Sequence, residues 1–127
     1  MDNLDTLAAH TAQAIIAATL DDYAGKEVDN LATKALGVLQ ENGVYAGMLF
    51  LYSRTGKDED IAPVIRGGLL ALVSTLVPGV VVPPDDAQSA LQWFADHIAN
   101  DLDTLLLVKQ VWEQTLIYVR YGAKARG

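Results

Sequence analysis

The most constraining feature of the sequence is its last long stretch, Asp103 to Arg126, which contains no proline and only one glycine. Seven apolar residues and one threonine recur in it at steps of mostly three and four residues: Leu105, Val108, Val111, Trp112, Thr115, Leu116, Val119 and Ala123. This spacing places them on one side of an α-helix and is typical of a helix packed against a core. At ~1.5 Å per residue the helix would be roughly 35 Å long, the thickness of a small domain. The rest of the chain must therefore cover one side of a long helix.

The preceding sequence supplies further helices for this purpose. They are predicted from Asn3 or Asp5 to about Leu20, from Lys26 to Glu41, from Val44 to about Ser53, from a cap at Asp60 to a stop before Pro78, and from a cap at Asp85 or Asp86 to a break at Asn100–Asp101. Asn42-Gly43 favours a helix end, because both residues tolerate the left-handed conformation. The helix that follows is apolar nearly all round, which is typical of a central helix. The predicted fold is all-α: one domain, 1–127, a compact bundle of five or six helices with a long C-terminal helix.

The composition excludes several classes of protein. With 127 residues the chain forms one domain with a real core. It has no cysteine, which excludes disulfides, thiolate metal ligands and thiol catalysis and suits a reducing cytosol. The opening MDNLDTL has acids where an export signal needs cations. The longest apolar run, Leu69–Val82, is shorter than the ~20 residues of a membrane span. We expect a cytoplasmic protein with no membrane partner.

The residue patterns of catalytic sites are missing from the sequence. His10 and His97 are the only histidines, and neither has a second metal ligand at helical spacing. Gly67-Gly68 lacks the Gly-Lys that completes a phosphate loop, and no Gly-x-Ser-x-Gly motif is present. No carboxylate sits in an apolar stripe where burial would raise its pKa. We therefore predict no enzyme, no catalytic residue, no metal and no cofactor.

Charged residues form a second pattern on the final helix. Lys109, Glu113, Arg120 and Lys124 follow one another at intervals of 4, 7 and 4 residues, which aligns them beside the apolar stripe. We call these four residues the ridge. It holds three cations in a chain of net charge −7. Cations are common at the negative end of any helix, and Glu113 can pair with Lys109. The ridge alone therefore indicates nucleic-acid contact only weakly.

The remaining face of the final helix is unusually apolar for a surface exposed to solvent. It carries Leu107, Gln114, Tyr118 and Tyr121. Aromatic residues in such a position are more often core or partner contacts than platforms for base stacking. The face therefore favours a function based on contacts with other macromolecules.

Two stretches resemble a known family. Gln40 to Leu51, QENGVYAGMLFL, is similar to the Asn-Gly-Leu-x-x-x-Leu-x-Phe-Leu segment of the helical small subunit of type III-B CRISPR effector (Cmr) complexes. The identical positions are Asn42, Gly43, Phe50 and Leu51, and the conservative ones are Val44 and Met48. The end of the chain, Leu116-x-Tyr118-Val119-x-Tyr121-x-x-Lys124, resembles the family's closing helix. It departs from the family at Gln114, where Glu is usual, and at Tyr121, where Trp is frequent.

The resemblance implies a non-catalytic, all-α subunit that functions in antiviral defence. Several copies would stack along a ribonucleoprotein that holds guide RNA and target RNA, while other subunits of the complex cut. The implied RNA-binding residues are Lys109, Arg120 and Lys124, with Lys34, Arg54 and Arg66 as further candidates. Contact with the RNA backbone needs no reading of sequence. The implied protein interface, between copies or with neighbouring subunits, contains Leu107, Tyr118 and Tyr121.

Two other functions remain open at this point. The chain could be a protein-only helical adaptor or oligomerisation module that never touches RNA. It could also be an enzyme or a carrier of a small ligand in the interior of the bundle, which would require a deep pocket with a buried carboxylate or with His97.

Overall fold

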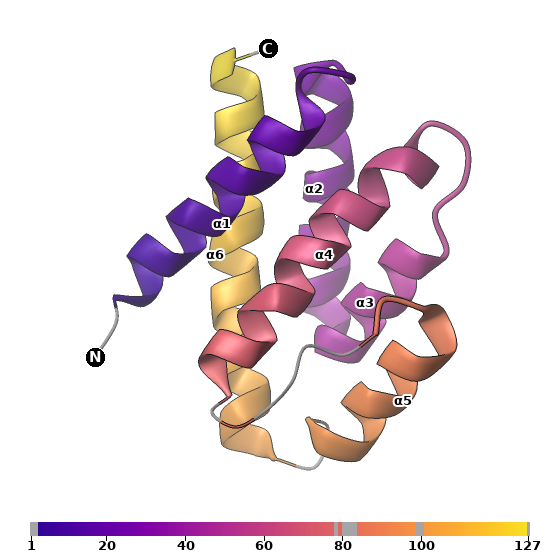
Figure 1. The fold of residues 1–127 in the computed structure, drawn as a ribbon, viewed down its shortest axis with the longest axis vertical. Helices are drawn as coiled ribbons and strands as arrows, with labels where there is room; N and C mark the ends of the chain where they lie inside the picture. Colours follow the sequence, from indigo (N-terminus) through magenta and orange to yellow (C-terminus); the bar gives the residue numbers. More distant parts are fainter. Residues whose placement is uncertain (1–2, 78, 80–83, 99–100, 127) are drawn as a thin grey trace.

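The computed structural model describes residues 3–77, 79, 84–98 and 101–126. These residues form six helices and no strand. The helices are α1 (Leu4–Thr19), α2 (Gly25–Asn42), α3 (Val44–Tyr52), α4 (Asp58–Leu76), α5 (Ala87–His97) and α6 (Leu102–Arg126) (Figure 1). The all-α fold with a long C-terminal helix is confirmed, and α6 is the longest helix at 25 residues. Among the described residues, no helix has the length and apolar character to cross a bilayer.

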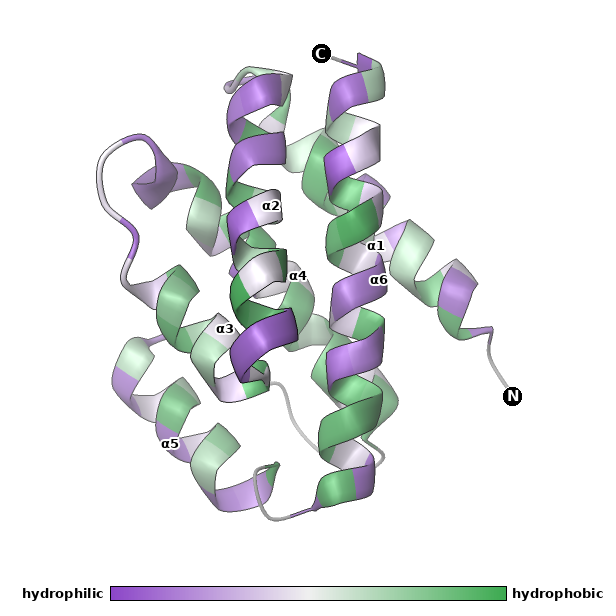
Figure 2. Cartoon of the chain, turned by 180° about the vertical axis from the view of Figure 1, so that it is seen from behind, coloured by the Kyte–Doolittle hydropathy of each residue, from purple (hydrophilic) through white to green (hydrophobic). Residues whose placement is uncertain are grey.

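Helix α6 is the element against which the others are arranged. It makes its most extensive contacts with α2, which lies beside it, and with α1, which crosses it (Figure 1). Helix α4 packs on α1, α2 and α3, and α5 is attached chiefly through α3. The reverse view in Figure 2 shows that α2 and α6 form the opposite face of the molecule. One side of α6 is therefore buried along most of its length, and the other side is free to meet solvent.

The buried side of α6 is the one that the sequence predicts. Its fully buried residues are Val108, Val111, Trp112, Thr115, Leu116, Val119 and Ala123, whereas Leu105 is half-buried. Trp112 lies at the centre, where its indole N–H donates a hydrogen bond to the carbonyl oxygen of Leu69 (3.0 Å). The ring of Phe94, from α5, meets Trp112 edge-on with a centroid separation of 5.6 Å. The large apolar ring is thus buried without an unsatisfied donor.

Side-chain caps begin three of the helices. Asn3, Asp86 and Asp101 each accept a hydrogen bond from a backbone N–H in the first turn that follows. These bonds satisfy donors that have no partner within the helix. The structure thereby selects Asn3 over Asp5 and Asp86 over Asp85 as the caps.

The predicted cap at Asp60 is wrong. Helix α4 begins two residues earlier, at Asp58, with Lys57 in the capping position and no side-chain cap. Gly56 adopts a left-handed φ of 65°, and its carbonyl accepts a bond from the N–H of Glu59 (3.3 Å). This tight turn starts the helix early, so the acids fall in its first turn, where they suit the positive helix end.

Two glycines fix how neighbouring helices meet. Gly43 has a φ of 95°, and its N–H bonds to the carbonyl of Leu39 (2.9 Å), which ends α2 as predicted. Helix α4 continues through Gly67–Gly68. A Cβ atom at Gly68 would lie 2.8 Å from Cδ1 of Ile15, so the missing side chain allows α1 and α4 to approach closely.

Helix α3 is less central than its apolar sequence suggests. It buries Val44, Met48 and Leu51 against its neighbours, but Tyr45 and Leu49 are exposed. The helix has only nine residues and is covered on its inner side alone. Its outer apolar side chains therefore face solvent.

Candidate functional site

The ridge forms on α6 as its spacing predicts, but each of its cations has an acidic neighbour. Arg120 Nε and Lys124 Nζ lie 3.5 and 3.9 Å from the two carboxylate oxygens of Asp29 in α2. Lys109 Nζ lies 3.7 Å from Glu113 Oε1 within the same helix. Two carboxylates therefore offset most of the charge of three cations.

The ridge pairs are long, and they differ in burial. The Lys124 side chain is 57% exposed, so solvent screens its attraction to Asp29 and this pair contributes ~0–1 kcal/mol. Arg120 and Asp29 are only 27% and 13% exposed. The Nε atom of Arg120 is buried and makes no hydrogen bond, so its contact with Asp29 is electrostatic only. Lys124 can therefore exchange its carboxylate for another anion more readily than Arg120 can.

Two of the further predicted RNA-binding residues are engaged locally. Lys34 Nζ lies 3.7 Å from Asp58 Oδ2, at the start of α4. The guanidinium of Arg54 stacks 3.8 Å above the ring of Phe50, and its Nε donates to the carbonyl of Phe50 (3.0 Å). Lys34 keeps an exposed ammonium group, whereas Arg54 is held against the end of α3.

Arg66 is fixed more firmly than any other predicted RNA-binding residue. Its Nε donates to Asp85 Oδ1 (2.6 Å), its Nη1 to the carbonyl of Leu51 (3.4 Å), and its guanidinium lies 4.1 Å from the ring centroid of Tyr52. The Tyr52 hydroxyl donates to the same Asp85 oxygen (2.7 Å). The Arg66 side chain is only 12% exposed. We call Arg66, Asp85 and Tyr52 the clamp; it ties the approach to α5 onto α3 and α4.

The clamp shifts the pKa values of its two acids in opposite directions. Burial raises the pKa of Tyr52, and the hydrogen bond to Asp85 raises it further. Burial would also raise the pKa of Asp85, but the hydrogen bonds from Arg66 and Tyr52 outweigh this effect and hold the pKa below its usual value. At neutral pH Tyr52 therefore stays protonated and can donate its hydrogen bond, and Asp85 stays ionised and can accept it.

The predicted protein-interface residues divide between core and surface. Tyr121 is exposed, but Leu107 and Tyr118 are half-buried and pack against the core. The Tyr118 hydroxyl donates a hydrogen bond to Asp5 of α1, which is the main reason that its pKa is raised. Of these three residues, Tyr121 is the one that is largely free to meet a partner.

Sequence reasoning missed two residues on this outer side. Leu102 and Leu106 are 66% and 53% exposed, comparable with Tyr121 at 60%. Figure 2 shows that hydrophobic positions are frequent near the start of α6. The run Leu105-Leu106-Leu107 held the signal, because three consecutive residues span about 200° of a helix and cannot all face one core. We call Leu102, Leu106 and Tyr121 the outer apolar set.

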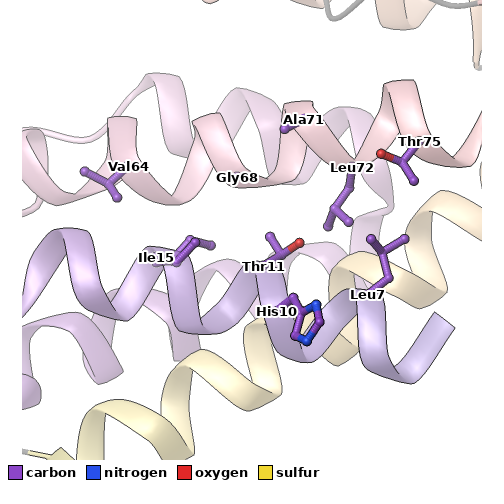
Figure 3. A pocket seen from close by; sticks show the side chains of 10 residues that line it. Leu7, His10, Thr11, Ile15, Val64, Gly68, Ala71, Leu72 and Thr75 are labelled. Carbon is purple, nitrogen blue, oxygen red and sulfur yellow. The ribbon is translucent and has the colours of Figure 1, made fainter. Parts of the chain in front are cut away.

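An apolar hollow with a volume of about 360 Å³ lies between α1 and α4 (Figure 3). Leu7 of α1 and Leu72 of α4 point into it, and His10 lies on α1 at its edge. No acidic residue lines it.

His97 is exposed on α5, beside the Trp93 ring at 5.2 Å. The interior around Trp112 has no free volume for a water molecule. Within the described ranges, no cluster of three His, Asp or Glu side chains could hold a metal.

Comparison with known proteins finds no similar chain: no family model, no curated protein and no solved structure matches.

Proposed function

We propose that this chain is a non-catalytic small subunit of a type III CRISPR RNA-guided effector complex. It stacks in several copies with other subunits of that complex and contacts the backbone of guide and target RNA in antiviral defence. The support comes from the resemblance of Gln40–Leu51 and of the final helix to the Cmr small subunit, together with the surface of α6 described above.

The outer apolar set is the observation that carries the proposal. Leu102, Leu106 and Tyr121 project from the outward side of one long helix whose other side is fixed in the core. Leu102 and Leu106 lie one turn apart, and Tyr121 lies about 22 Å farther along the helix. A partner that covers all three must therefore extend along α6, as a neighbouring copy would. A neighbouring copy or subunit that covers them removes apolar area from water at about 25 cal/mol per Å².

The RNA contact follows from the exposed cations of the ridge. A phosphate group that approaches Lys124 replaces Asp29 at little cost, because this exposed pair contributes ~0–1 kcal/mol and Asp29 keeps Arg120 as a partner. Binding through such contacts is independent of base sequence and releases counterions. A single copy is expected to bind weakly, because its net charge is −7, and stacked copies bind more tightly through avidity.

The alternative function is a protein-only adaptor. It is favoured by one observation: each ridge cation already has a carboxylate within 4 Å. In that case the cations hold α6 to α2 and to itself, and only the outer apolar set acts on a partner.

One experiment with two arms tests the proposal. Leu106→Asp with Tyr121→Asp is expected to abolish co-assembly with the effector subunits, measured by size-exclusion chromatography, because a charge would be buried at the contact. Gln88→Asp with Gln92→Asp, on the exposed side of α5, adds the same two charges away from α6 and is the control. Tyr118→Asp is a poorer choice, because that residue is half-buried and bonded to α1.

The second arm measures RNA. Lys109→Gln, Arg120→Gln and Lys124→Gln together are expected to leave assembly intact and to lower RNA retention by the complex severalfold. The logarithm of affinity should fall with the logarithm of salt at roughly 0.7 per phosphate neutralised. Unchanged retention removes the ridge from RNA contact. An assembled complex that contains this chain and retains no RNA at all identifies the protein-only adaptor.

A further inference from the structure

A polar groove lies on the side of α2 that faces away from α6, and it contains lysines that are less engaged in ion pairs than the cations of the ridge. It lies between the start of α2 and the loop before α4 and has a volume of about 420 Å³. Lys26 and Lys34 reach it from α2, and Lys57 from the loop. Glu27 and Asp58 also line it. Three cations therefore face two acids in one hollow.

Two of these lysines differ from every ridge cation. Within the part of the chain that the structure describes, neither Lys26 nor Lys57 forms an ion pair. Both side chains are exposed. Lys34 has a single long pair with Asp58, and its side chain is 58% exposed. An incoming anion meets Lys26 and Lys57 without first displacing a carboxylate, whereas at Arg120 and Lys124 it competes with Asp29.

The lining of the groove holds one more cation than acids, although the segments that border it are acidic. Segments 21–34 and 53–60 contain four Lys or Arg and seven Asp or Glu, a net charge of −3. Of those seven acids, Glu27 and Asp58 line the groove. The attraction for an anion is therefore local to the three lysines, and salt should weaken it strongly.

The chemistry of the groove suits a phosphodiester backbone. Lysine ammonium groups act as point charges toward phosphate and do not need a fixed bidentate geometry. Asn30 and Thr55 add neutral hydrogen-bonding groups to the lining, which suit sugar hydroxyls and phosphate oxygens. No aromatic residue lines the groove, so it offers no platform for stacking a base.

From these observations we infer that the phosphodiester backbone of single-stranded RNA binds in this groove, at Lys26, Lys34 and Lys57. The inference deepens the function proposed above and depends on it. It assigns the main RNA contact to Lys26 and Lys57, which the resemblance does not indicate, together with Lys34, which is one of its weaker candidates. The ridge then contributes a weaker, secondary contact along α6.

The test compares two double variants of the full chain. Lys26→Gln with Lys57→Gln removes the two unpaired groove lysines, and Lys109→Gln with Lys124→Gln removes two lysines from the ridge. Binding of a fluorescein-labelled oligouridylate is measured by anisotropy from about 50 to 200 mM salt. The groove variant is expected to bind about tenfold more weakly, with a salt slope smaller by roughly 1.4. The ridge variant is expected to change affinity by less than about threefold.

A second measurement locates the contact directly. The wild-type chain is acetylated with and without the oligouridylate, and modification of each lysine is read by mass spectrometry. Protection should be strongest at Lys26 and Lys57 and weak at Lys109. Inorganic phosphate at the same phosphate concentration should protect neither, because one phosphate lacks the linked charges of a backbone.

Each outcome decides between the two claims. If the wild-type chain binds and the ridge variant loses more affinity than the groove variant, the groove assignment is wrong and the proposed function stands. If inorganic phosphate protects the groove as well as RNA does, the site is for a single phosphate and the backbone assignment is wrong. If the wild-type chain binds no RNA even at the lowest salt, the groove assignment is overturned, and the proposed function is decided by RNA retention in the assembled complex.

Discussion

The cations of α6 and those of the groove lie on two sides of the same helix, α2, and differ in what surrounds them. Arg120 and Lys124 share Asp29, whereas Lys26 and Lys57 have no acidic partner among the described residues. The ridge residues are the more regularly spaced in the sequence, whereas the groove lysines are the more accessible to an incoming anion. Regular spacing places side chains on one face, but neighbouring helices determine whether those side chains are free.

Arg66 is the extreme case of a cation engaged by its own protein, and replacing it should have the largest effect. Arg66→Gln is expected to lower the free energy of unfolding by about 1 to 2 kcal/mol, because Asp85 loses its charge partner in a partly exposed site. RNA affinity should not change beyond about twofold. Chemical denaturation and anisotropy measure the two quantities, with the exposed Arg126→Gln as control. A loss of RNA binding without loss of stability would place Arg66 with the groove lysines.

The difference between ridge and groove should disappear when Asp29 is neutralised. Asp29→Asn leaves Arg120 and Lys124 without their carboxylate, so RNA affinity is expected to rise about threefold to fivefold at low salt. Asp96→Asn, which removes one charge from α5, controls for the change in net charge. Equal effects of the two variants would show that Asp29 does not restrain the ridge.

The clamp should also give the chain an acid-sensitive element that the ridge lacks. The pKa of Asp85 is lowered in the folded state, so its stabilising contribution is complete above its unfolded pKa of about 3.9. The contribution is lost as the pH falls through the lower, folded-state pKa. Asp85→Asn should therefore reduce stability at pH 7 and reduce the further loss on acidification, measured by denaturation at several pH values. The effect at pH 7 should be comparable with that of Arg66→Gln, because the largely buried Arg66 loses its carboxylate partner.

Most features that depend on residues close together in the sequence could be predicted from it. The stripe on α6, the end of α2 at Gly43 and the caps at Asn3 and Asp86 follow from spacing and from residues that act within one turn. The exception is Asp60, where the turn at Gly56 moved the start of α4. Leu106 was missed although its signal was present in the run Leu105-Leu106-Leu107.

The candidate site was harder to predict, because its decisive contacts join residues far apart in sequence. Asp29 lies 91 positions before Arg120, and no local pattern indicates that the two meet. In the same way, Lys26 and Lys57 lie in different segments and face one groove only after α2 and α4 have packed. Periodicity within one helix carries no information about either arrangement.

The most direct test of the account is native mass spectrometry of the affinity-tagged chain purified from cells that encode it. The account predicts an assembly in which several copies of this chain accompany larger subunits and a short RNA, and in which ribonuclease treatment or high salt reduces the mass by that of the RNA. A monomer without RNA, or an assembly whose mass is accounted for by protein alone, would contradict it.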